Sequence, residues 1–140
     1  MLFETLGDRQ NPAILFFHAM GVTGASSKPV AQYLKDSYFC ILPTSTVYRE
    51  GQKYLSKADE VRQIEDFLQK ENVKDLACVV ASSIGADLAM AFLSQTQRPV
   101  GHVFFDGGQF ARIGKATRRL MTPFLHLAIK SLYRSKGGTL

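Results

Sequence analysis

Four short apolar runs, none of which alternates regularly with polar residues, constrain the fold of this chain more than any other feature. They occupy residues 13–17, 38–42, 76–81 and 100–105. A strand with one face in water alternates apolar and polar residues, so runs of this kind indicate strands that are buried on both faces. Residues 2–6 are predicted to form a further short strand at the start of the chain. Strands buried in this way occur in sheets that helices cover on both sides.

Helical patterns separate the apolar runs. A first helix is predicted after Ser26 or Ser27, either of which can cap it, with Pro29 in its first turn. The apolar residues expected on one side of this helix are Val30, Tyr33 and Leu34.

Two further helices are predicted, at residues 58–71 and 84–95. The first has acids in its first turn and one amphipathic stripe. That stripe consists of Val61, Ile64, Phe67 and Leu68. The second is apolar almost all round, which predicts a buried helix. The alternation of strands and helices predicts an α/β fold, with a mostly parallel sheet of about four to five strands and helices on both faces.

The length of 140 residues fits one domain, but the charge is distributed unevenly along it. Residues 1–110 carry 10 basic and 12 acidic side chains, whereas residues 111–140 carry seven basic ones and no acid. A basic terminal segment can bind nucleic acid or an anionic membrane surface. Its cations are interleaved with aliphatic residues, however, and no nucleic-acid motif accompanies them, so we expect neither partner. Two helices are predicted here, at 111–121 and 123–134, the second capped by Thr122.

Several classes of protein are excluded by what the sequence lacks. No apolar run approaches the roughly 20 residues that cross a bilayer, and the first ten residues lack the regions of a signal peptide. Cys40 and Cys78 lie in apolar runs, which predicts reduced core thiols in a cytoplasmic protein. The histidines lie on separate elements, and neither Cys-x-x-Cys nor a G-x-G-x-x-G after a strand is present. We therefore expect no metal and no cofactor.

The turn at residues 81–86, ASSIGA, joins a predicted strand directly to a predicted helix. A serine on such a turn projects its hydroxyl above the sheet, and small residues two before and two after it relieve crowding. Ala81 and Gly85 take those positions around Ser83. The helix N-terminus also favours developing negative charge. The pattern predicts Ser83 as a nucleophile; the alternative is that Ser82 or Ser83 merely caps the helix.

The loop at residues 17–24, FHAMGVTG, follows the first central strand. Acyl transfer needs two backbone N–H groups directed at the developing oxyanion. Ile84, which follows the predicted nucleophile, can supply one of them, and Met20 stands where the second is expected. The alternatives are a flexible loop or a phosphate-binding turn, although the Gly-Lys-Ser/Thr ending of a phosphate loop is missing.

Residues 1 to about 110 resemble the N-terminal half of an α/β-hydrolase-superfamily protein, and the matching segments are FFHAMGVTG, YFCILP, the helix before LACVV, ASSIGA and HVFFDGG. The resemblance implies that Ser83 is the nucleophile and that the Met20 and Ile84 amides form the oxyanion hole. It also implies a structural role for the histidine that begins the loop, His18.

The resemblance has two departures and one extension. Ala19 stands where family members usually have glycine, and Ala81 replaces the first glycine of the nucleophile turn; both substitutions are small. Residues 111–140 resemble the start of a helical cap or lid over the site.

A serine hydroxyl needs a base that takes its proton and a third group that orients the base. In this fold the chain order is serine, acid and then histidine. The later histidines are His102, which lies inside a predicted strand, and His126, which lies on a predicted apolar helix. Asp106 ends the strand beside the nucleophile strand, where sites form in open α/β sheets. It can be the acid or an ordinary strand exit, and neither interpretation supplies a histidine.

The leading interpretation is a serine hydrolase that acts on an ester, thioester or similar acyl bond of a small molecule, in a truncated or split form. We therefore expect an open sheet edge and a cap helix that a second copy or another protein covers. The alternative is a catalytically inactive hydrolase-fold protein that acts as a binding or interaction module, since fold alone does not determine function.

Overall fold

The computed structural model describes residues 1–108, 114, 119, 121–124 and 127. The chain divides into two compact units, Met1–Gln109 and Phe110–Leu140. The elements named below all belong to the first unit.

A five-stranded sheet forms the centre of the first unit, in the order β1-β3-β2-β4-β5. Its strands are β1 (Leu2–Leu6), β2 (Ala13–Phe17), β3 (Phe39–Thr44), β4 (Leu76–Ser82) and β5 (Val100–Asp106). β1 runs antiparallel to β3, and the other neighbours are parallel. The prediction of a mostly parallel sheet with four to five strands is confirmed.

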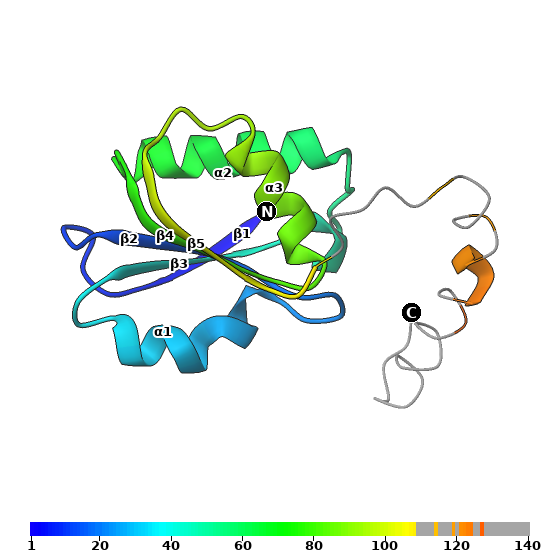
Figure 1. Ribbon diagram of the computed structural model, residues 1–140, viewed down its shortest axis with the longest axis horizontal. Coiled ribbons are helices and arrows are strands. Elements are labelled where there is room, and N and C mark those ends of the chain that lie inside the picture. The colour runs from blue at the N-terminus through cyan, green and yellow to red at the C-terminus, as the bar shows by residue number, and fades with distance from the viewer. Residues whose placement is uncertain (109–113, 115–118, 120, 125–126, 128–140) are drawn as a thin grey trace. The chain divides into compact units, whose positions relative to one another are not determined.

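Helices cover both faces of this sheet, as predicted (Figure 1). α1 (Lys28–Leu34) lies on one face, and α2 (Lys57–Lys70) and α3 (Gly85–Leu93) lie on the other. Two short 3₁₀ helices, η1 (Gly24–Ser27) and η2 (Thr46–Tyr48), follow β2 and β3. The connections between parallel strands therefore contain the helices that the sequence pattern places there.

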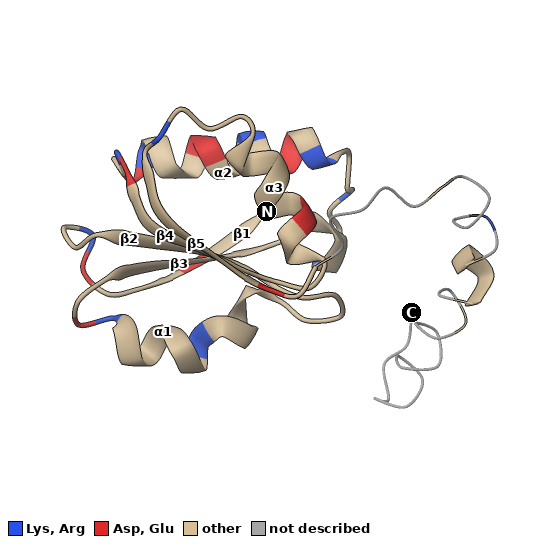
Figure 2. Cartoon of the chain, viewed as in Figure 1, with Lys and Arg blue, Asp and Glu red and all other residues tan. Residues whose placement is uncertain are grey.

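The packing explains why the central strands do not alternate. Every residue of β2 and β3 is buried. Ile14 and Phe16 pack on the α1 side, whereas Ala13, Leu15 and Phe17 pack with α2 and α3 on the other side. Both pleat faces of a central strand therefore require apolar side chains. The charged side chains lie mainly on the helices and loops, and the central strands carry none (Figure 2).

Two details of the helices differ from the predictions. In α1, Ala31 is buried, whereas Val30 and Tyr33 are exposed, Tyr33 by 90%. The short helix therefore packs through Ala31 and through Leu34, which is partly buried against the same cluster, so of the three predicted residues only Leu34 contacts the core. In α3 only one side is buried, and Met90 is 48% exposed, so this helix covers the sheet without being enclosed.

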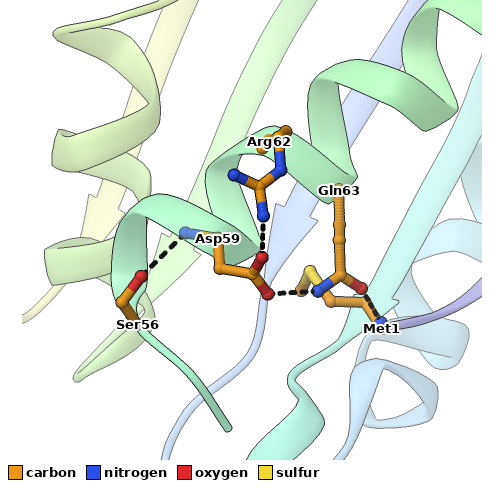
Figure 3. A network of polar contacts seen from close by, with 5 residues as sticks. All are labelled: Met1, Ser56, Asp59, Arg62 and Gln63. Carbon is orange, nitrogen blue, oxygen red and sulfur yellow. Dashed lines mark hydrogen bonds and ion pairs between the residues drawn. The ribbon is translucent and has the colours of Figure 1, made fainter.

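The start of α2 is held by polar contacts (Figure 3). The Ser56 hydroxyl caps the helix by accepting a hydrogen bond of 3.1 Å from the backbone N–H of Asp59. The Asp59 carboxylate accepts from Gln63 Nε2 at 2.7 Å and also pairs with Arg62. Gln63 in turn accepts from the amino group of Met1, which ties the first residue of the chain to the helix.

The second unit is described at only a few residues. Residues 121–124 are helical, so Thr122 lies within a helical segment, where the sequence predicts a cap between two helices. No helix in the described part of the chain is long and apolar enough to cross a membrane.

Candidate active site

Ser83 occupies the sharp turn between β4 and α3, in an unusual backbone conformation. Its φ angle is +51°, a left-handed value that costs an L-residue about 1–2 kcal/mol. The residue is exposed. Its backbone N–H donates to the carbonyl oxygen of Asp106 at 2.9 Å, which continues the β4–β5 ladder by one further bond. Strained residues of this kind are concentrated at functional sites.

Gly85 brings the start of α3 against the end of β2. A Cβ atom at this position would lie 2.6 Å from the carbonyl oxygens of both Phe17 and His18. No side chain fits at that distance, so only glycine allows the helix to approach the strand this closely. The serine turn and the loop that begins at His18 are therefore in direct backbone contact.

The two predicted oxyanion amides belong to these adjoining turns. Phe17 is in register with Ala81, so the loops after β2 and β4 leave the same edge of the sheet. Within the described residues, neither the Met20 N–H nor the Ile84 N–H has a hydrogen-bond partner. Both side chains are exposed, by 42% and 51%. Backbone N–H groups without a partner, near the end of a parallel strand, are the kind of donor that an oxyanion hole uses.

His18 is buried, and both of its ring nitrogens contact the backbone. Nε2 accepts from the backbone N–H of Ser45 at 3.1 Å, so Nδ1 carries the proton and donates to the carbonyl oxygen of Ala19 at 2.8 Å. The Tyr48 ring packs edge-on against the imidazole, with 5.3 Å between centroids. An imidazole used in this way shapes the loop and has no free nitrogen with which to take a proton from a serine.

Sequence reasoning missed the buried carboxylate of Glu60. It lies in the first turn of α2, and its Oε1 atom accepts three hydrogen bonds. The donors are Ser45 Oγ at 2.7 Å, Thr46 N at 2.7 Å and Thr46 Oγ1 at 2.9 Å. A signal was present: Glu60 stands four residues before Ile64, on the apolar stripe of an amphipathic helix, where an acid needs buried partners.

Asp106 ends β5, in register with Ser82. Its side chain is exposed, and it forms no ion pair within the described residues. Gly107 and Gly108 follow with φ angles of +73° and +131°, so the chain turns sharply after the strand. The structure thus places Asp106 beside the serine turn through its backbone, and its exposed carboxylate lies at the same edge of the sheet.

The later histidines do not meet Ser83 in the described part of the chain. His102 is in register with Cys78, four residues before the end of the ladder, or about 13 Å along the strand. It is exposed on β5, where the sequence analysis places it within a strand. His126 lies outside the described residues.

The cysteines do not compete as nucleophiles. Cys40 and Cys78 are both free thiols, as predicted, and they lie in register on either side of Ile14. Burial raises the pKa of both thiols. A raised pKa keeps them protonated, and a protonated thiol is a poor nucleophile and a poor metal ligand.

No protein-family model and no curated protein sequence matches the chain. Several solved structures, in contrast, are similar to it in fold. A hydrolase described as a putative α/β hydrolase family protein from Desulfitobacterium hafniense is 20% identical, with a TM-score of 0.76 over 85% of this chain and 49% of that one. A thermophilic esterase from Thermogutta terrifontis is 14% identical, with a TM-score of 0.73 over 85% of this chain and 44% of that one.

A thioesterase domain from the curacin biosynthetic pathway is 21% identical, with a TM-score of 0.68 over 90% of this chain and 48% of that one. The chain thus spans about half the length of these structures. The predicted resemblance is confirmed at the level of the fold: the chain has the fold of part of an α/β hydrolase.

Proposed function

We propose that this chain is a serine hydrolase acting on an ester, thioester or similar acyl bond of a small molecule. The observation that carries the proposal is the conformation of Ser83, exposed and at positive φ on a strand-to-helix turn. Through Gly85, the turn with Ser83 contacts the loop that contains Met20. The backbone N–H of Met20 has no hydrogen-bond partner among the described residues. Esterases and a thioesterase domain share the fold, which supports the chemical class.

In the proposed reaction, Ser83 Oγ attacks the carbonyl carbon and forms a tetrahedral intermediate. The Met20 and Ile84 N–H groups donate hydrogen bonds to its oxyanion, since neither has another acceptor among the described residues. A base, considered below, takes the hydroxyl proton of Ser83 during the attack and returns it to the alcohol or thiol as the bond between this group and the carbonyl carbon breaks. Water then hydrolyses the acyl-serine, which releases the acid and restores the serine hydroxyl.

The reaction also needs a base. His18 has no free nitrogen and His102 lies along the strand, so we propose that the base comes from residues other than those described. Asp106 is our candidate for the acid that orients it, since its exposed carboxylate ends the strand beside Ser83. The truncated or split form inferred from the sequence is part of this proposal, because the chain spans about half of the similar structures.

The alternative function is a catalytically inactive binding or interaction module with the same fold. The hydrogen bonds of both His18 nitrogens favour this alternative, because His18 then cannot serve as a base for Ser83.

The unpaired thiols of Cys40 and Cys78 fit a reducing compartment, and a cytoplasmic location remains a prediction.

A fluorophosphonate probe, which reacts with activated serines, separates the two functions. We expect the chain to be labelled, Ser83→Ala to abolish labelling, and the neighbouring Ser82→Ala to retain it. Mass spectrometry of the modified peptide identifies the serine. A folded chain that is not labelled, either alone or with the rest of a longer gene product, would favour the binding module.

A further inference from the structure

Among the described residues, the hydrogen bonds that hold the loop with Met20 to the rest of the chain come from one segment, at the end of β3. We call residues 44–48 the clamp. Among the described residues, it contacts the loop at three places: Ser45 N to His18 Nε2 at 3.1 Å, Gly21 N to Tyr48 Oη at 3.0 Å, and Gly24 N to Thr44 Oγ1 at 2.9 Å. One segment of five residues therefore fixes the beginning, the middle and the end of the loop.

The clamp is itself rigidly supported. Thr44, Ser45 and Thr46 are buried. The Glu60 carboxylate binds Ser45 and Thr46 through three hydrogen bonds of 2.7 to 2.9 Å, from the first turn of α2. Hydrogen bonds to a charged acceptor are stronger than those between neutral groups. The polar contacts thus run from a helix, through the clamp, to the loop.

Tyr48 makes the contact nearest to the proposed oxyanion amide. Its hydroxyl accepts from Gly21, the residue directly after Met20, and its ring packs against His18, two residues before Met20. Gly21 has a φ angle of +78°, and a Cβ atom there would meet nothing within 4 Å. Its side of the loop is therefore open, and the Tyr48 hydroxyl is the one group among the described residues that holds the Gly21 N–H.

We propose that Tyr48 is a positioning residue, whose hydroxyl fixes the direction of the Met20 amide by holding Gly21. This inference rests on the proposed function, because the Met20 amide matters only if it binds an oxyanion. Tyr48 belongs to η2, which is separate from the loop with Met20 and from the turn with Ser83 and Ile84. The phenol acts on the substrate through the backbone of the loop.

The test compares Tyr48→Phe, which removes the hydroxyl and keeps the ring on His18, with Tyr33→Phe. Tyr33 is 90% exposed on α1, so its hydroxyl serves as the control. Exchange of the Gly21 amide with water, followed by ¹⁵N NMR on the full chain, reports the hydrogen bond directly. In Tyr48→Phe we expect this exchange to be at least about fivefold faster, and fluorophosphonate labelling of Ser83 to be about threefold to tenfold slower, in a chain that is still folded.

Each outcome decides the proposal. Faster Gly21 exchange with slower labelling in Tyr48→Phe alone supports it. Unchanged exchange overturns it, and so does faster exchange with unchanged labelling, because the bond then shapes the loop without affecting the reaction. If the parent chain is never labelled, the proposed function fails. In that case, faster exchange of the Gly21 amide in Tyr48→Phe still shows that Tyr48 holds the loop. Unchanged exchange shows that Tyr48 does not hold the loop.

Discussion

At the scale of single residues, the site depends on backbone groups brought unusually close together. Gly85 is the clearest case, because two carbonyl oxygens, of Phe17 and His18, occupy the space where a side chain would begin. The glycine is therefore required by a close approach, whereas its φ angle is not in the left-handed range. A substitution there moves the serine turn away from the loop.

Gly85→Ala is expected to lower the free energy of unfolding by about 2–3 kcal/mol, the upper part of the range for forcing an extra methyl group into a packed site. Gly51→Ala is the control, since Gly51 has a φ angle of +72° and nothing within 4 Å of an added Cβ atom. That variant carries backbone strain alone, which costs about 1–2 kcal/mol. Urea unfolding followed by circular dichroism measures both. Equal losses would mean that α3 shifts enough to relieve most of the overlap with the Phe17 and His18 carbonyl oxygens.

At the scale of elements, the ends of the helices differ in how they are closed. α2 begins with a side-chain cap, in which Ser56 accepts from the Asp59 N–H at 3.1 Å. Ser27 occupies the same position at α1 but makes no side-chain cap bond, because η1 leads directly into the helix. The sequence cannot separate these cases, since both serines precede a helix.

Ser56→Ala is therefore expected to destabilise the chain by about 1 kcal/mol, the usual loss of a capping hydroxyl. Ser27→Ala, at a helix start without such a bond, should change the free energy of unfolding by a few tenths of a kcal/mol at most. Chemical denaturation of the two variants beside the parent chain tests the difference. A loss of equal size in both would show that the two hydroxyls act through something other than capping.

The elements were predictable to different degrees for physical reasons. The strands were recoverable because β2 and β3 are buried on both faces and so lack alternation. The orientation of α1 was not, because seven residues offer two apolar sides, and the contact goes through Ala31 rather than Tyr33. The serine turn follows from local spacing and was predictable. The contacts of Glu60 and Tyr48 were not, since they join residues 14 to 30 positions apart.

At the scale of the whole molecule, the edge strand β5 presents apolar surface that no other part of the first unit covers. Val103 and Phe104 are 41% and 59% exposed, and no charged residue precedes Asp106 on the strand (Figure 2). Natural edge strands usually carry charges or prolines that prevent pairing with other chains. We therefore propose that the chain self-associates through β5, as we also expect from the sequence for an open sheet edge. The exposed apolar side chains of this strand support the proposal.

We expect the sedimentation coefficient of the chain to rise with concentration, and Phe104→Asp to reduce that rise. Tyr33→Asp places the same charge at a more exposed aromatic position on α1, and it should leave the association unchanged. Analytical ultracentrifugation over about a hundredfold range of concentration measures both. A monomer at every concentration, or equal effects of the two variants, would exclude β5 as the contact.

The hydrogen bond between the Ser83 N–H and the Asp106 carbonyl has a mechanical consequence. It lies beyond the last register pair of the β4–β5 ladder, at the point where the chain leaves the sheet. A pulling force that enters from the residues after Asp106 would load this bond before any other rung of the ladder. Tension on the residues after Asp106, during translation or through a tether, would thus break the hydrogen bond of the Ser83 N–H while the other hydrogen bonds of the sheet remain formed.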